Sequence, residues 1–530
     1  MKRISNIYIM MALLAGILTS CHKDLDLKPT NDITADVVYT TPQGYKQSLA
    51  KVYSSFALTG GGGTSATIGD IGGIDQGTSD FLRLYWNIQE LASDEALCAW
   101  QDPGIPELNF MTWNSNNVLL QGLYARSLYQ ITVANDFIRE SMDDKLAGRG
   151  IEGADAEAIR VYSLEARFLR AYQYWVLMDL FGNPPFVTEE DPISKTPPRQ
   201  ISRADLFNYI ESELLAIEGG LTDPQQNEYG RVDKAASWML LARLYLNAEV
   251  YLGSGNSKYT QAIEYASKVI NSGYMLKSNY RHLFLADNDQ NRDEIILSIN
   301  YDAIKTQNFG GTTFLINSST NGQMNPASFG IPGGGWGGNR SKSTLPGKFS
   351  DISGNTDKRA MFFGTNPVIN DVATFAQGLA VTKFRNVDVN GAPAPSNDGT
   401  QCSVDFPLFR LADAYLIYAE AVLRGGEGGS STTALEYVNK IRERAYGNSS
   451  GNINNLSLDF ILDERAREFY WEAYRRTDLI RFGKYTDANY VWPFKGGTQS
   501  GAGVQNFKTI FPLPALDVIS NPNLTQNAGY

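Results

Sequence analysis

The sequence predicts a mainly α-helical protein, in which a scaffold of paired helices carries long irregular loops. Seven segments repeat their apolar residues at helical spacing, Gly-rich turns join some of them into pairs, and two long stretches show little helical pattern. The chain has 530 residues, of which 43% are hydrophobic and 19% are charged. This composition supports a large buried core and excludes global disorder.

The first residues predict an export signal. A short positive start at residues 2–3 precedes the apolar run 7–18, which is shorter than the roughly 20 residues that span a bilayer as a helix. Small residues and then Cys21 follow in the arrangement of a bacterial lipobox; the alternative is an ordinary cleaved signal with a coincidental cysteine. We expect residues 1–20 to be removed, Cys21 to be acylated and 21–40 to form a polar tether, so that lipid alone holds the protein to a membrane.

The helical segments contain small alanines at packed positions beside large tyrosine, leucine and tryptophan side chains. This pattern is typical of tetratricopeptide-like helix hairpins, although the repeats are degenerate and not contiguous. Gly253, Ser254 and Gly255 form the turn of one such hairpin. The predicted helices are 159–181, 205–217, 233–252, 259–270, 408–423, 432–444 and 458–482.

Two long insertions break the helical pattern, at about 60–115 and about 306–405. The first is rich in glycine and then in aromatic residues, and the second is rich in glycine, asparagine and serine. Loops of this length in a compact protein usually carry function. We therefore expect residues 41–530 to form a single unit with a ligand face built from these loops.

Charge and composition exclude several classes of function. The formal net charge is −11, and an acidic chain repels the phosphates of nucleic acids. Two histidines exclude a metal site with three histidine ligands, and three cysteines exclude a disulfide framework or a four-cysteine site. No catalytic motif occurs in the structural context that it requires, which predicts that the protein is not an enzyme.

Acidic residues leave two alternatives open. A glycosidase requires only two carboxyl groups, so Asp94 or Glu95 in the aromatic-rich region, with a distant carboxylate, could serve a lipid-anchored glycosidase. The run 287–294 (DNDQNRDE) alternates oxygen ligands that suit Ca²⁺, but it lacks the glycine and glutamate positions of an EF-hand loop. An acidic solvated turn is the alternative for this run.

Several segments, in order along the chain, resemble one known family. They are the lipobox cysteine, 165–171 (EARFLRA), 410–415 (RLADAY), 464–469 (ERAREF), 478–483 (DLIRFG), 511–514 (FPLP) and 521–530 (NPNLTQNAGY). Together they make the chain similar to the RagB/SusD family of Bacteroidetes outer-membrane nutrient-uptake lipoproteins. The resemblance implies a tetratricopeptide-like fold, a lipid anchor at the cell surface, and capture of glycan for a SusC-like TonB-dependent transporter without catalysis.

Within that family the chain is most similar to the members that bind starch. Carried across by position, the resemblance implies that Trp100 and Phe309 belong to an arc of aromatic rings, with Trp336 as a flanking platform. It also implies that Asp75 and Arg83 bond sugar hydroxyls. These roles agree with sugar chemistry, because an aromatic ring covers the apolar face of a sugar and charged side chains bond its rim. The first expected ligand is a starch-type α-glucan.

Three departures from the family's pattern affect the expected sugar rather than the expected fold. Cys98 stands where a further arc tryptophan is expected, and Phe309 lacks the hydroxyl of the arc tyrosine. Asp102 and Pro103 occupy the stretch that holds a binding asparagine in the starch binder. Capture of another cargo, such as a fructan, a host glycan or a peptide, is therefore an alternative.

The resemblance also concerns metal and partners. It implies a structural Ca²⁺ in the loop at Asp289, with Asp405 as a second ligand. No cofactor is required for the expected function. The expected partners are the glycan, the transporter and the membrane that holds the lipid anchor, and nucleic acid is not expected.

Overall fold

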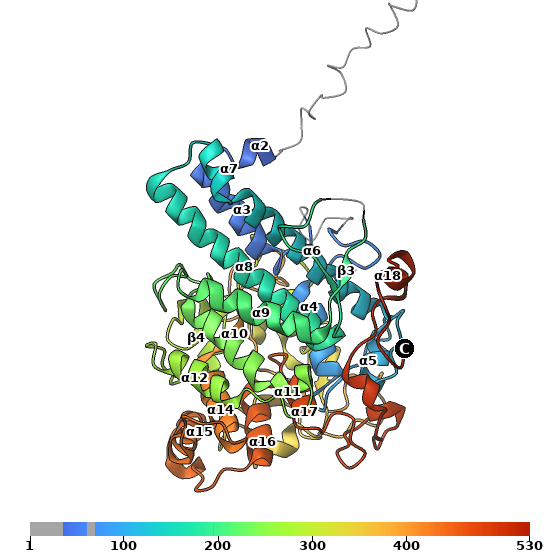
Figure 1. Ribbon diagram of the computed structural model, residues 1–530. Coiled ribbons are helices and arrows are strands. Elements are labelled where there is room, and N and C mark those ends of the chain that lie inside the picture. The colour runs from blue at the N-terminus through green and yellow to red at the C-terminus, as the bar shows by residue number, and fades with distance from the viewer. Residues whose placement is uncertain (1–34, 61–68, 194–195) are drawn as a thin grey trace, which may run out of the picture.

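The computed structural model describes residues 35–60, 69–193 and 196–530 (Figure 1). The predicted signal segment 1–20, Cys21 and most of the predicted tether 21–40 lie outside these residues. At the end of the predicted tether, α2 (Ala35–Val38) is helical and Tyr39 is buried in the core. The folded unit therefore includes the last residues of that tether.

Most of the scaffold consists of helices. The longer ones are α3 (Pro42–Ser54), α6 (Val118–Glu140), α8 (Gly153–Phe181), α9 (Arg203–Glu218), α10 (Lys234–Leu246), α12 (Tyr259–Ile270), α14 (Leu411–Leu423), α15 (Ser431–Tyr446) and α16 (Leu458–Phe469). The shorter ones are α4 (Phe81–Trp86), α5 (Ile105–Phe110), α7 (Asp143–Gly148), α11 (Ala248–Leu252), α13 (Gly311–Ser318), α17 (Arg475–Arg481) and α18 (Ala515–Ser520), with a π-helix over Asn87–Leu91. The predicted mainly α fold is confirmed.

The long helices pack in pairs along the chain. α6 packs on α8 and α8 on α9, and later α10 packs on α12, α12 on α14, and α14 on α15 (Figure 1). Ala242, Ala262 and Ala419, on α10, α12 and α14, are fully buried, because small side chains let neighbouring helices approach closely. This arrangement confirms the predicted scaffold of helix hairpins. Among the helices of the described residues, none is both long enough and apolar enough to cross a membrane.

Ordinary capping sets the boundaries of the predicted helices. Ser202 and Ser430 precede α9 and α15, and each hydroxyl accepts a hydrogen bond from the third amide of its helix. α15 ends at Gly447, whose φ of 75° lies in the left-handed region that glycine adopts without steric cost. These local signals explain why periodicity placed both helices within a few residues of their observed ends.

The prediction of a single helix over 458–482 is wrong. Residues 470–474 separate α16 from α17, and within them Trp471 and Ala473 have positive φ angles of 66° and 62°. Tertiary contacts fix this break, because the Trp471 carbonyl accepts a hydrogen bond from the Trp86 indole and the Ala473 amide donates to Glu90. Helical periodicity carries no information about such contacts.

Short antiparallel strand pairs hold the irregular segments. β4 (Ile295–Ile299) pairs with β8 (Phe406–Arg410), β1 (Ala96–Cys98) with β5 (Asn339–Ser341), and β6 (Phe362–Phe363) with β7 (Ala380–Val381). Because β8 occupies the start of the predicted helix 408–423, α14 begins only at Leu411. The predicted helix 233–252 is interrupted at Asn247, between α10 and α11. The first insertion is more ordered than predicted, since it holds α4, the π-helix, β1 and α5.

A group of buried ion pairs joins the helices to the second insertion, and we call it the Arg410 network. Arg410, at the end of β8, contacts Glu468 and Glu472 at 3.0 and 2.8 Å. Arg444 on α15 and Arg359 in the second insertion also contact Glu468, at 2.6 and 3.2 Å. These side chains are at most 4% exposed. The irregular part of the chain is therefore attached to α15 and α16 by charge as well as by apolar packing.

We expect the Glu468→Gln substitution to lower the free energy of unfolding by roughly 3–5 kcal/mol, because it leaves buried guanidinium groups without their counter-charge. Burial alone would raise the pKa of Glu468, but the charges of Arg444 and Arg410 outweigh burial and hold the pKa below its ordinary value. The stability from this group is thus present above the ordinary pKa of 4.5 and is lost as the pH falls through the lower native pKa. Urea unfolding at pH 7 and at decreasing pH measures both effects.

Glu157→Gln is the matched control, since Glu157 is 74% exposed in its ion pair with Arg160 and exposed pairs contribute little to stability. An unfolding midpoint of Glu468→Gln equal to that of the wild type would contradict a stabilising role for the Arg410 network.

Candidate functional site

The structure brings together the five residues that the resemblance suggested for sugar contact. Phe309 and Trp336 have ring centroids 6.0 Å apart, and Trp336 and Trp100 have centroids 6.5 Å apart. The Arg83 guanidinium lies 5.7 Å from the centroid of the Trp100 ring. Asp75 is close enough to influence the pKa of Arg83. We call Trp100, Phe309 and Trp336 the aromatic cluster.

The rings of the aromatic cluster are accessible from solvent. Phe309 is 39% exposed, and Trp100 and Trp336 are half-buried. Neighbouring rings are inclined to one another rather than stacked, with interplanar angles of 67° between Phe309 and Trp336 and 42° between Trp336 and Trp100. Such a surface offers several ring faces and edges to an apolar ligand face.

Two helix starts fix the positions of Arg83 and Phe309. Asp80 is the N-cap of α4, and its carboxylate accepts a hydrogen bond from the Arg83 amide at 2.9 Å. The same carboxylate accepts one from the amide of Gly311, the first residue of α13, at 2.8 Å. Gly310 permits this contact, because a Cβ at that position would lie 2.0 Å from the Cβ of Asp80. One buried carboxylate therefore sets the distance between the two segments.

The Arg83 side chain crosses the base of the aromatic cluster. Its Nη1 donates to the Phe309 carbonyl oxygen at 2.9 Å, and its guanidinium lies 4.8 Å from the centroid of the buried Phe314 ring. Burial lowers the pKa of Arg83, and neighbouring carboxylates, that of Asp75 above all, oppose this effect. Because a guanidinium carries five N–H donors, the half-buried side chain keeps donors available to a ligand. The carboxylate of Asp75 is also exposed, and its Oδ1 accepts hydrogen bonds from the amide and hydroxyl of Thr78 at 2.9 and 3.0 Å.

Backbone contacts between two segments position Trp100. The Ala99 amide donates to the Gly338 carbonyl oxygen at 2.9 Å, and the Trp100 indole donates to the Gly337 carbonyl oxygen at 2.5 Å. The Trp100 ring lies against Gly338, where a Cβ would be only 2.6 Å from the ring. The ring is therefore held in one place by the segment that also carries Trp336.

Asn317, near the end of α13, holds the loop that carries Trp336. Its carbonyl oxygen accepts from the Trp336 amide at 2.8 Å, and its side-chain oxygen accepts from the Gly335 amide at 3.0 Å. Its side-chain nitrogen donates to the carbonyl oxygens of Thr313 and Thr400. Sequence reasoning missed this residue, because the only signal is an asparagine some way before a Gly-rich segment.

The residues that depart from the family's pattern differ in their exposure to solvent. Cys98 is fully buried in β1, and burial raises the pKa of its thiol to about 12. Its backbone amide and carbonyl bond the side chain of Asn109 at 3.1 and 2.8 Å. Asp102 and Pro103 are exposed. Cys98 therefore presents no ring to a ligand, whereas the segment at Asp102 is open to solvent.

Asp94 and Glu95 are closed off from solvent. Asp94 is 0% exposed, and its carboxylate accepts hydrogen bonds from Arg475 at 2.6 and 2.9 Å and from Tyr490 at 2.8 Å. Glu95 is 1% exposed and interacts with the buried Glu90. Neither carboxyl group can reach a polysaccharide in this structure, so the geometry does not support the glycosidase alternative.

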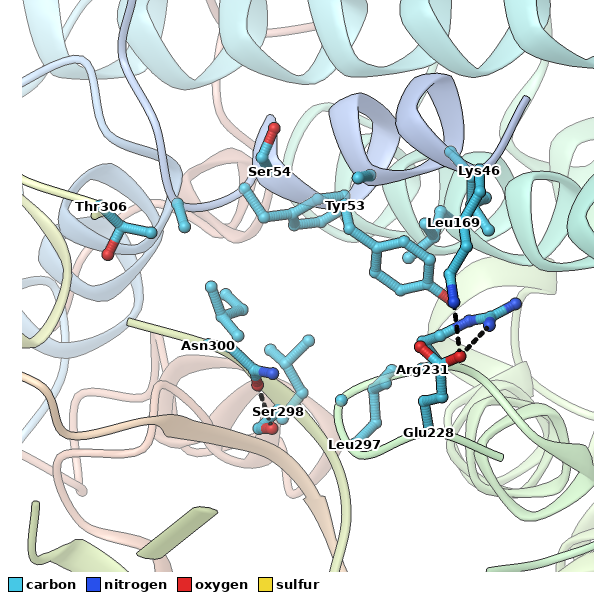
Figure 2. A pocket seen from close by; sticks show the side chains of 17 residues that line it. Lys46, Tyr53, Ser54, Leu169, Glu228, Arg231, Leu297, Ser298, Asn300 and Thr306 are labelled. Atoms are coloured by element: carbon cyan, nitrogen blue, oxygen red, sulfur yellow. Dashed lines mark hydrogen bonds and ion pairs between the residues drawn. The ribbon is translucent and has the colours of Figure 1, made fainter. Parts of the chain in front are cut away.

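A separate cavity of about 300 Å³ lies between α3, the segment 228–231 and β4 (Figure 2). Its walls are mostly apolar, and polar groups at its edge bond one another: Lys46 donates to Glu228 at 2.7 Å, and Ser298 donates to Asn300 at 2.6 Å. Apolar walls whose polar groups already bond one another do not match the hydroxyl rim of a sugar, although Tyr53 and Phe56 are among the lining residues. The aromatic cluster, rather than this cavity, is therefore the candidate site.

The two predicted Ca²⁺ ligands lie near one another but differ in exposure. Asp405 is 3% exposed, whereas Asp289 is exposed. Burial raises the pKa of Asp405 to about 7, and the negative charge of Asp289 adds to this rise. The Asp405 carboxylate already accepts a hydrogen bond from the Tyr301 amide at 2.8 Å.

The donor set for Ca²⁺ is small. The described residues contain no group of three or more His, Cys, Asp or Glu side chains that could hold a metal. Because Ca²⁺ takes about six to eight oxygen ligands, carbonyl oxygens and waters would have to supply most of them. The Ca²⁺ site stays a prediction.

Comparisons with known proteins give concordant results. Residues 253–530 match the model of the SusD family. The chain is 36% identical to starch-binding protein SusD from Bacteroides thetaiotaomicron, with 98% of each chain covered. Surface glycan-binding protein A from Bacteroides fluxus shares the fold at 22% identity, with a TM-score of 0.69 and coverage of 92% of this chain and 100% of that chain. Surface glycan-binding protein A from Bacteroides thetaiotaomicron in complex with laminarihexaose does so at 19% identity, with a TM-score of 0.68 and coverage of 92% and 99%.

If Ca²⁺ binds between Asp289 and Asp405, adding CaCl₂ after EDTA treatment should raise the melting temperature by several degrees, because an ion that binds only the folded state stabilises it. The Asp289→Asn and Asp405→Asn variants should lose this response, and MgCl₂ should not replace CaCl₂. Differential scanning calorimetry gives the measurement. Superimposable melting curves of the wild type in EDTA and in CaCl₂ would exclude the site.

Proposed function

The chain belongs to the SusD family, and we propose that it is a cell-surface glycan-binding lipoprotein without catalytic activity. The observation that carries this proposal is the convergence of three accessible rings with Arg83 and Asp75. Sugars have apolar C–H faces and a rim of hydroxyl groups. The aromatic cluster suits the faces, and a guanidinium beside a carboxylate suits the rim.

A starch-type α-glucan is the first choice of ligand. The support is the 36% identity to a relative named as a starch-binding protein, over nearly the whole chain. The alternative is capture of another glycan or nutrient, and two observations support this alternative. A fold relative binds laminarihexaose, and Cys98 contributes no ring to the site.

Two further parts of the proposal rest on the family rather than on this site. The first is delivery of the captured glycan to a SusC-like TonB-dependent transporter in the outer membrane. The second is attachment to the outer surface through lipid on Cys21. An acyl anchor and a binding site open to solvent are compatible, since the anchor leaves the folded unit free in the aqueous phase.

The proposed role also explains why the aromatic cluster is open to solvent. Several half-buried rings give modest affinity for one ligand segment, and a polymer that contacts many anchored copies gains avidity from effective concentration. A polysaccharide also needs a surface that it can cross, whereas a closed cavity suits a small molecule.

Native affinity electrophoresis tests the proposal. The protein without residues 1–21 is run in gels with and without starch, dextran, levan and laminarin. Retardation by starch supports the first choice, and retardation by another glycan alone supports glycan capture with a different specificity. No retardation by any of the four, or release of reducing sugar from them, would contradict a glycan-binding role without catalysis.

We expect Trp100→Ala to weaken binding of the retained glycan at least about tenfold, equivalent to ~1.4 kcal/mol, because it removes the ring between Trp336 and Arg83. Isothermal titration calorimetry measures the change, and the melting temperature checks that the fold is intact. Trp238→Ala is the control, since Trp238 is a half-buried tryptophan on α10 that contacts Lys268 instead. Equal binding by Trp100→Ala and Trp238→Ala would rule out a role for the aromatic cluster.

We expect Cys21→Ala to move the protein from the membrane fraction to the soluble fraction and to abolish labelling by a fatty-acid analogue, because the predicted acylation site is lost. Cys402→Ala is the control, since that thiol is buried within the folded unit. Retention of Cys21→Ala in the membrane fraction, with labelling unchanged, would refute the anchor.

A further inference from the structure

One more aromatic ring lies next to the segment that connects the aromatic cluster. A Cβ placed on Gly337 would be 3.3 Å from the Cδ1 and Cγ atoms of Phe375. Gly337 follows Trp336 in the chain, and its carbonyl oxygen accepts the hydrogen bond from the Trp100 indole. Phe375 is half-buried, like both tryptophans. Its ring therefore lies directly beside the backbone that supports the cluster.

A buried arginine bonds the turn that carries Phe375. Arg340 on β5 is 1% exposed. It donates to the carbonyl oxygens of Val372 at 2.5 Å and Gln377 at 2.9 Å, and also to that of Thr374. These three acceptors surround residue 375 in the sequence. The guanidinium also lies 5.8 Å from the centroid of the Phe375 ring. β5 pairs with β1, so the strand before Trp100 and this turn share one support.

Hydrogen bonds within the turn make it rigid. The Gln377 side-chain oxygen accepts from the amides of Asn370 and Asp371 at 2.7 and 2.9 Å. The Asp371 carboxylate accepts from the Ala373 amide at 3.1 Å and from the Thr374 hydroxyl at 2.5 Å. The turn therefore presents residue 375 in a fixed orientation, as a site that binds without reorganisation requires.

Apolar anchoring of the turn comes from other side chains. Ile369 and Val372 are 6% and 9% exposed, and they pack with Leu97 and Phe494 in a small core of their own. The Phe375 ring does not belong to that core. Because the turn is anchored without it, a half-buried phenylalanine at this position is available for contact with a ligand.

We propose that Phe375 forms an additional sugar subsite, which extends the aromatic cluster past Gly337 and is used by longer glycan chains. This inference rests on the proposed function, because it assumes that the aromatic cluster binds glycan. A short oligosaccharide occupies Phe309, Trp336 and Trp100 alone. A longer one continues beyond Gly337 and places a further sugar face on Phe375. Chain-length preference is therefore set in part by the Arg340-supported turn.

The test compares long and short ligands of the glycan series that the wild type binds. The probes are maltoheptaose and maltotriose, or laminarihexaose and laminaritriose if laminarin is the glycan retained. Phe375→Ala should weaken binding of the long probe about fivefold, equivalent to ~1 kcal/mol, and change binding of the short probe less than about twofold. Phe375→Tyr should bind both probes as the wild type does, because it keeps the ring.

Phe482→Ala is the matched control, since Phe482 is another half-buried phenylalanine beside an arginine, Arg424, and touches none of the aromatic cluster. It should bind both probes normally. Unchanged binding of the long probe by Phe375→Ala overturns the subsite. So does an equal loss for both probes, which would mean that Phe375 only supports Trp336 and Trp100. If the wild type binds none of the four glycans, or if Trp100→Ala binds the retained glycan as the wild type does, the proposed site fails and the subsite fails with it.

Discussion

The Arg410 network is the constraint on which the rest of the structure depends. Burying so many charges is costly, and the cost is offset only where each charge meets its partner with good geometry. Glu468 satisfies this condition because three guanidinium groups surround it, one from β8, one from α15 and one from the second insertion. A shift of any of these elements would leave a buried charge unpaired. The network therefore favours one relative placement of the helical scaffold and the irregular insertion, which apolar packing alone would not specify so narrowly.

Outside the Arg410 network, single polar side chains hold the loop segments in place through hydrogen bonds, as backbone ladders do in regular secondary structure. Asp80 bonds the starts of two helices and so fixes Arg83 relative to Phe309. Asn317 bonds the loop that carries Trp336. Arg340 bonds the turn that carries Phe375. Each of these three side chains is buried, and each bonds at least two backbone groups, at least one of which belongs to another segment. Long loops can therefore present rings in fixed positions without strands or helices at the point of contact.

The sequence predicted the scaffold well and the site only through resemblance. Helical periodicity, with serines before α9 and α15, located those elements because their signals are local. The break between α16 and α17 could not be predicted in that way, since the left-handed Trp471 and Ala473 are held by Trp86 and Glu90 from far along the chain. The role of Asn317 could not be predicted either, because its hydrogen-bond partners come near it only when the loop is folded. The fold alone brings together the five residues of the candidate site, and their spacing in the sequence does not predict this. They are Asp75, Arg83, Trp100, Phe309 and Trp336. Their roles toward a ligand remain predictions.

The separation between anchor and site explains how one fold can accommodate different ligands. The ion pairs that fix the scaffold involve β8, α15, α16 and Arg359 of the second insertion, whereas each ring of the aromatic cluster lies on a different loop. Solved structures at 22% and 19% identity share the architecture with this chain, but a shared fold does not assign their ligands to it, because function resides in the site rather than in the fold. If the aromatic cluster binds glycan as proposed, its specificity follows from the distances between the rings, and these distances depend on a few buried side chains such as Asp80, Asn317 and Arg340. Comparing those supporting residues between relatives is consequently as informative about the ligand as comparing the rings themselves.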